Sequence, residues 1–322
     1  MEQAAFEWTA LPYLPLQGLG TKCAESLDFY SLRFCWATGW SVSQLSYLFD
    51  PPSEKGRHRL RPSYYLFGAR REAQLALMER MTGNPDMRYS TFWVLKDVLN
   101  TKGLYRAGSA PRRWCPVCYD QWDPESSWEP MVWQLPSVGR CPIHDCDLVD
   151  QCEECGASQA RDVSIDRRDR CDSCGASLGA KGVATPRPKF YDWVENETFK
   201  LVAFCSTPGQ ACLSGGTVTE FAEGIEALAR DAKVLQMVRR CLALQRGESF
   251  TGRLSLSGFI NLAALLGTSV VHLLTHPKEA MSAPLLDLWS NFHWICDPFV
   301  PQDDAIRATR WLARKVMTRC GG

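Results

Sequence analysis

Apolar residues recur at helical spacing through the first hundred positions of the chain. The pattern predicts four helices, over residues 24–40, 41–49, 71–83 and 90–103. Gly39, near the end of the first range, is a C-cap candidate, and Ser41 or Ser43 is placed to cap the second helix. Pro51 stops the second helix. We therefore expect an N-terminal helical domain over residues 1–111.

Helical periodicity returns in the last third of the chain. We expect one long amphipathic helix over residues 219–244, two helices on either side of Gly267 within 253–277, and a last helix over 303–317. The long helix carries its apolar stripe at Phe221, Ile225, Leu228, Leu235, Val238 and Leu242. These segments predict a C-terminal helical domain over residues 183–322.

Between the two helical parts, over residues 112–182, the periodicity is lost and turn residues and cysteines dominate. Such a segment is expected to bury little apolar surface, so bound metal would have to stabilise it. The fold class expected is mainly α, with a central tandem zinc-ribbon region between two helical domains.

Composition narrows the class of protein. The chain has 322 residues, 45% hydrophobic and 22% charged, which is typical of a globular protein. The formal net charge is zero, so no overall field draws it onto nucleic acid. The first residues do not resemble a signal peptide and no apolar run is long enough to span a membrane. We expect a soluble cytoplasmic protein without a membrane partner.

The fifteen cysteines are not expected to form disulfides in that reducing compartment, and the central ones occur in C-x-x-C pairs. Cys152, Cys155, Cys171 and Cys174 have the spacing C-x2-C-x15-C-x2-C, which is typical of a zinc ribbon. Zn²⁺ prefers four tetrahedral thiolate or imidazole ligands in structural sites. Gly156 and Gly175 stand where the chain must turn sharply after the second thiolate of each pair.

A second ligand set precedes this one. Cys115, Cys118, Cys141 and His144 have the spacing C-x2-C-x22-C-x2-H, with Pro116 and Pro142 inside the two pairs. Each C-x-x-C or C-x-x-H pair is expected to form a knuckle. Cys146 is an alternative to His144 as the fourth ligand, and the spacing of the other pairs favours His144.

Both ligand sets are complete, whereas a catalytic zinc keeps one position open for water. We therefore expect two structural zinc ions. The chain also lacks a Walker A or G-x-G-x-x-G sequence, and no catalytic residue is assigned. The order of the ligands also fits a cross-braced RING domain, but the seven residues between His144 and Cys152 favour two sequential sites.

The segment 253–277 has the residue pattern of a helix-turn-helix motif. In that motif the second helix contacts DNA bases with its N-terminal residues. Here the residues for possible DNA contact are Thr268, Ser269 and His272. A helical hairpin within a core is the alternative, because the second helix lacks Arg, Lys, Asn and Gln.

Two groups of residues together resemble a known family. The opening "LPLQGLGTKCAESLDFYSLRFCWATGWSVSQL" and the cysteine-containing "RWCPVCYDQW", "CPIHDCDLVDQCEECG" and "CDSCG" resemble the TniQ/TnsD transposition proteins over roughly residues 11–178. The last third is similar only in type. Cys146 and the weakly basic second helix of the 253–277 segment depart from the family pattern.

The resemblance implies a non-enzymatic role in choosing the target of a transposon. Such proteins recruit an AAA+ ATPase regulator, and some read DNA directly while others dock onto a CRISPR Cascade complex, often as a dimer. The segment Leu14–Leu32 would face the ATPase. The alternative function is a zinc-ribbon and helix-turn-helix transcription regulator, and a RING-type ubiquitin ligase is a third.

Overall fold

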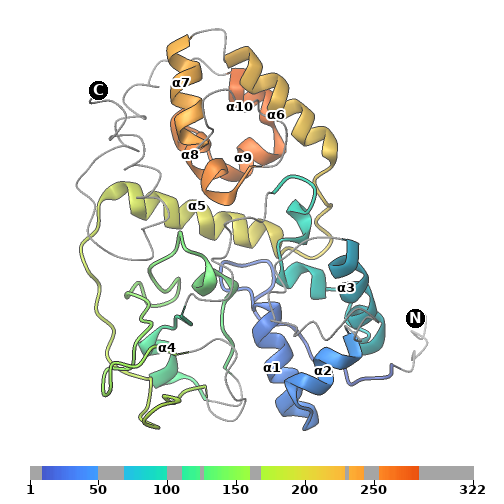
Figure 1. Cartoon of the computed structure of the whole chain (residues 1–322), viewed down its shortest axis with the longest axis vertical. Coiled ribbons are helices and arrows are strands. Elements are labelled where there is room, and N and C mark those ends of the chain that lie inside the picture. The colour runs from blue at the N-terminus through green and yellow to red at the C-terminus, as the bar shows by residue number, and fades with distance from the viewer. Residues whose placement is uncertain are drawn as a thin grey trace, which may run out of the picture.

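The computed structural model is mainly helical (Figure 1). It describes residues 9–49, 69–99, 111–123, 127–159, 168–228, 232–242 and 254–282. Its α-helices are α1 (Leu27–Thr38), α2 (Val42–Phe49), α3 (Ala69–Thr82), α4 (Pro116–Gln121), α5 (Lys189–Cys205), α6 (Gly215–Leu228), α7 (Ala232–Cys241), α8 (Leu256–Leu266), α9 (Val270–Thr275) and α10 (Pro277–Ser282). The described residues also contain the 3₁₀ helices η1 (Met87–Ser90), η2 (Trp93–Leu95) and η3 (Met131–Gln134). Within these ranges β-structure is limited to isolated bridges.

The first helices begin and end where capping residues predict. Ser26 Oγ accepts a hydrogen bond from Phe29 N at the start of α1, and Gly39 adopts the left-handed conformation after it, with φ 71°. Ser41 Oγ accepts from Gln44 N and caps α2. The helices α1 to α3 enclose a small apolar core of their own, which includes Leu27, Tyr30, Phe34, Leu45, Leu75 and Met78.

The helix predicted over residues 90–103 is wrong in its described part, which contains only η2 and turns up to Leu99. Local side chains compete with the helical backbone there. Ser90 Oγ donates to Met87 O, and Thr91 Oγ1 donates to Arg88 O while it accepts from Trp93 N. The segment still reaches the core, because Phe92, Val94, Leu95, Val98 and Leu99 are buried.

The long helix predicted over residues 219–244 is also wrong. The structure has two helices, α6 and α7, whose axes run in different directions (Figure 1). The apolar stripe is kept, since Phe221, Ile225 and Val238 are buried. Two shorter helices let this stripe face two neighbours, as α6 packs on α10 and α7 packs on α8.

The helices on either side of Gly267 are confirmed. Gly267 ends α8 with φ 65°, a left-handed conformation that favours glycine. Ser269 then caps α9, because its Oγ accepts from His272 N. The predicted helix over residues 303–317 lies outside the described part of the chain.

The main apolar core crosses all three predicted domains. It joins Val94 and Leu95 to residues of the central region, such as Trp114 and Trp133, and to residues of α5 to α10. The central region therefore buries more apolar surface than we expected, because the segment 129–138, between Cys118 and Cys141 in the sequence, packs inward. Helix α5 lies across the middle of the molecule and packs against η3, α8 and α9 (Figure 1).

None of the helices in the described ranges combines the length and the apolar character that a membrane crossing requires.

Candidate metal centres

The structure brings the predicted ligands together in two groups. One group is Cys115, Cys118, Cys141 and His144, and the other is Cys152, Cys155, Cys171 and Cys174. Within each group the ligand atoms all lie within 4.8 Å of one another. The grouping follows the order of the chain, so the cross-braced RING arrangement is wrong for these residues.

The distances fit a tetrahedral metal ion. Zinc bonds of about 2.3 Å to sulfur and 2.0 Å to nitrogen put tetrahedral ligands about 3.8 Å (S to S) and 3.5 Å (S to N) apart. In the first group Cys118 Sγ lies 3.7 Å from Cys141 Sγ, and Cys115 Sγ lies 3.5 Å from His144 Nδ1. In the second group the Cys152–Cys174 and Cys155–Cys171 pairs are 3.8 and 3.6 Å apart. Both clusters can therefore hold a metal ion.

Three of the four ligand pairs form the same knuckle. The first cysteine donates its N–H to the carbonyl five residues later, in Cys141–Cys146, Cys152–Ala157 and Cys171–Ala176, at 2.8, 3.0 and 2.8 Å. The residue before that carbonyl has positive φ in each case: Asp145, Gly156 and Gly175, at 49°, 70° and 73°. The sharp turn expected at the two glycines is confirmed. Asp145 makes the same turn although it is not a glycine.

The position of Cys146 in its knuckle differs from that of the ligands. Cys146 occupies the knuckle position that Ala157 and Ala176 occupy in the other two turns. Its Sγ lies 3.4 Å from Cys115 Sγ but outside the group of four mutually close ligand atoms. The geometry therefore favours His144 as the fourth ligand.

The first ligand pair differs from the knuckle that we expected. Cys115 is the N-cap of α4, and Pro116 opens that helix. Cys115 Sγ accepts from Cys118 N at 3.4 Å, as a capping oxygen would. Pro116 suits this position, because the first helical residue does not need its N–H. The ligand pair is held by a helix instead of a turn.

Two glutamines that the sequence did not single out contact the ligands. His144 Nε2 lies 3.0 Å from Gln121 Oε1 at the end of α4. A proton on Nε2 leaves Nδ1 free for a metal, as in most metal-bound histidines. Buried Gln159 donates to Cys171 Sγ at 3.3 Å and accepts from Asp172 N at 2.9 Å. Neither glutamine stands at a motif position, so the sequence carries no signal for them.

The two clusters differ in exposure. Cys115, Cys118 and Cys141 are buried, whereas Cys155 and Cys174 are exposed. Both clusters contribute ligands to the main core, but the second also has two ligands that face solvent. Solvent and chelators reach the second cluster more easily.

A buried ion cluster connects the segments that carry the ligands. Glu129 accepts hydrogen bonds from Arg112 Nε at 2.8 Å, Tyr119 Oη at 2.5 Å and Arg168 Nη1 at 3.2 Å. Burial of Glu129 by itself raises the pKa of its carboxyl, but Arg112 and Arg168 outweigh burial and lower that pKa to about 2. Arg112 precedes the first ligand pair and Arg168 precedes the last, so Glu129 joins the two metal segments.

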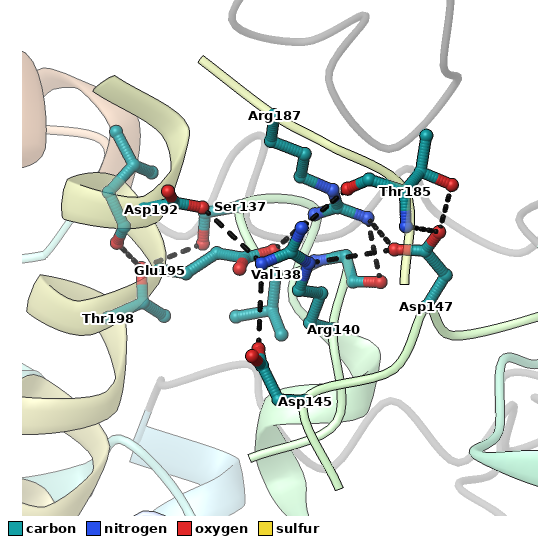
Figure 2. Close-up of polar contacts among 12 residues, drawn as sticks. Ser137, Val138, Arg140, Asp145, Asp147, Thr185, Arg187, Asp192, Glu195 and Thr198 are labelled. Atoms are coloured by element: carbon teal, nitrogen blue, oxygen red, sulfur yellow. Dashed lines mark hydrogen bonds and ion pairs between the residues drawn. The ribbon is translucent and has the colours of Figure 1, made fainter. Parts of the chain in front are cut away.

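A second polar cluster attaches the Cys141–His144 knuckle to α5. Figure 2 shows Arg187 between Glu195 of α5 and Asp147, with ion pairs of 2.6 and 2.7 Å. Glu195 also accepts from Gly139 N at 2.6 Å. Burial raises the pKa of the Glu195 carboxyl, against the effects of Gly139 and Arg187. A side chain at position 139 would displace the Arg187 guanidinium, because a Cβ there would lie 2.4 Å from Arg187 Nη1.

The residues predicted for DNA contact serve internal roles in part. Ser269 caps α9, and the next backbone N–H, of Val270, donates to buried Glu197 of α5 at 2.8 Å. An acidic group thus occupies the helix N-terminus that would approach DNA. Thr268 and His272 are half-buried, and His272 stacks on His276. DNA contact by these residues stays a prediction.

Comparison with known proteins bears on the N-terminal and central parts. The model of the TniQ family matches residues 17–148. This range contains α1 to α4 and all four ligands of the first metal cluster. No curated protein matches the chain. The resemblance found in the sequence is confirmed over the matched range, where residues 17–148 are similar to TniQ proteins.

Proposed function

We propose that this chain is a non-enzymatic adaptor that selects the target in DNA transposition. It recruits an AAA+ ATPase regulator to a target site marked by DNA sequence or by a CRISPR Cascade complex. The observation that carries the proposal is the match to the TniQ family over residues 17–148, which points to target selection in transposition. The two complete ligand sets, seven residues apart, support the proposal further. The resemblance to the family includes both sets in this order.

The metal in both clusters is proposed to be Zn²⁺ with a structural role. Thiolates and a neutral imidazole are ligands that zinc prefers, and each cluster supplies four of them. A bound zinc ion would cross-link the chain segments that carry its ligands. Four protein ligands leave no position for a substrate, which supports binding over catalysis.

The structure narrows the segment proposed to face the ATPase. In Leu14–Leu32 the second half is buried, with Leu27, Phe29 and Tyr30 no more than 1% exposed. Residues 14–23 are mostly half-exposed or exposed, and Tyr13 beside them is 59% exposed. The contact is therefore proposed for the extended stretch before α1.

The test is co-purification with any AAA+ protein whose gene lies beside the gene of this chain. Tagged full-length chain should retain that protein, and Tyr13→Ala with Lys22→Glu should weaken retention at least tenfold. Lys189→Glu, an exposed lysine on α5, makes the same charge change and should have no effect. The chain alone should show no ATPase or nuclease activity. Absence of any AAA+ partner would overturn the proposal.

A gel shift separates this proposal from the transcription regulator. A regulator would bind its own DNA site without partners, with a Kd on the order of 10⁻⁸ M or tighter. Whether the target is marked by DNA or by Cascade is decided in the same assay, by adding the purified effector complex and its guide RNA. The position of Glu197 at the N-terminus of α9 does not favour the regulator.

A further inference from the structure

A groove lies beside the exposed metal cluster. Its walls are the start of α4, the segment 149–154 and the segment 174–180, and its volume is about 440 Å³. This lies within the range of about 300–1,000 Å³ of ligand pockets. The groove is open at the surface, where Gln151, Cys174 and Ser177 are exposed.

The groove has an apolar floor and an acidic rim. The floor is made by Trp114, Pro116, Val149 and Leu178, which are buried or half-buried. Among the residues that line the groove, the charged ones are Glu153 and Glu154, and both are exposed. A divalent ion bound by four thiolates would add a formal charge of about −2 beside them. The lining of the groove itself is therefore acidic.

Hydrogen bonds hold the walls in place. Trp114 Nε1 donates to Leu178 O at 3.0 Å, and Ala180 N donates to Pro116 O at 3.2 Å. Gly179 lies directly on α4, since a Cβ there would be 2.8 Å from Asp120 N. The groove is preformed, so a ligand would not have to order these segments.

We propose that this groove binds a long basic side chain, Arg or Lys, presented by an apolar-rich segment of a partner protein. The methylene stem of such a side chain covers apolar surface while its charged end stays in water. Here the stem would lie on Val149 and Leu178, and the cation would reach Glu153 and Glu154. DNA does not suit the groove, because its phosphates would meet the same carboxylates. The proposal does not depend on the role in transposition.

The test uses fluorescein-labelled hexapeptides and fluorescence anisotropy with the full, metal-loaded chain. One peptide carries two arginines among leucines, one replaces the arginines with glutamates, and one replaces the leucines with serines. The arginine–leucine peptide should bind with a Kd of roughly 0.1–1 mM or tighter. The other two should bind at least tenfold more weakly.

Two groove variants test the location. Glu153→Gln with Glu154→Gln should weaken binding about tenfold, as expected for the loss of two exposed ion pairs. Ser177→Trp should weaken it at least as much by filling the groove without a change of charge. The control is Glu220→Gln with Glu223→Gln, the same charge change on α6 at the other end of the molecule (Figure 1).

Binding that both groove variants weaken and the control leaves unchanged would support the proposal. No binding of the arginine–leucine peptide, equal binding of the serine peptide, or equal weakening by the control would each overturn it. Tighter binding of a short DNA duplex that the groove variants abolish would overturn it as well. Circular dichroism and zinc content show that the variants remain folded.

Discussion

Replacement of Glu129 by glutamine should destabilise the protein by about 2–4 kcal/mol. The carboxylate of Glu129 is buried and accepts hydrogen bonds from Arg112, Tyr119 and Arg168. Removal of one partner from a buried ion pair costs about 3–5 kcal/mol, because the other charge is left without compensation. Glutamine keeps the shape and one acceptor oxygen, and that remaining hydrogen bond is worth about 1 kcal/mol.

The pKa of Glu129 gives an independent magnitude. Folding lowers this pKa from 4.5 to about 2. Because the folded pKa is depressed, the carboxylate contributes stability that is complete above about pH 4.5 and is lost as the pH falls toward 2. At about 1.4 kcal/mol per pH unit the contribution is roughly 3 kcal/mol. The two routes agree.

The assay is urea unfolding of metal-loaded protein at pH 7, where the thiolate ligands keep the metal bound, followed by far-UV circular dichroism. The variant should unfold at a lower urea concentration than the wild type. Glu226→Gln, an exposed acid on α6, should stay within about 0.5 kcal/mol of wild type. A Glu129→Gln variant within that same margin at pH 7 would refute the ion-cluster reasoning.

Three further predictions follow from the metal clusters. Gln121→Ala should weaken metal binding about 10- to 100-fold at the first cluster only, because Gln121 orients His144. Competition with a chromophoric chelator measures this affinity, and an unchanged value would show that the contact has no such role. A chelator should remove the metal of the second cluster first, since Cys155 and Cys174 are exposed; release of both ions in a single phase would contradict this, and Cys155→Ser identifies the faster phase. Asp145→Gly should stabilise the chain by about 0.5–1 kcal/mol, because glycine adopts positive φ without strain, whereas Gly156→Ala should destabilise it by about 1 kcal/mol. Melting temperatures that change in the same direction in both variants would contradict the shared knuckle.

Sequence reasoning worked best where local chemistry decides the structure. Gly39, Ser41 and Gly267 mark helix ends that the structure reproduces, because capping depends on residues next to one another. Cysteine spacing grouped the ligands correctly for a similar reason. A C-x-x-C pair fits one turn or the first turn of a helix. Because one tetrahedral ion takes four ligands, each ion must be bound by two of these pairs, which leaves few possible groupings.

Sequence reasoning failed where tertiary contacts decide the local structure. Apolar spacing over residues 90–103 suggested a helix, but Thr91 donates to the backbone of Arg88, and five of the eight residues from Phe92 to Leu99 are buried without forming one. The apolar stripe from Phe221 to Leu242 predicted one amphipathic helix, whereas the structure divides it between α6 and α7. Gln121 and Gln159 contact ligands through the folded geometry alone.

The continuity of the main core limits how the protein can be dissected. Helix α5 packs on η3, and Trp133 shares one apolar cluster with Val194 and Leu265. A chain shortened at residue 182 would leave that cluster facing water, so its loss of partner binding would report misfolding instead of a missing interface. Interfaces of this protein are therefore best mapped by single surface substitutions in the full-length chain.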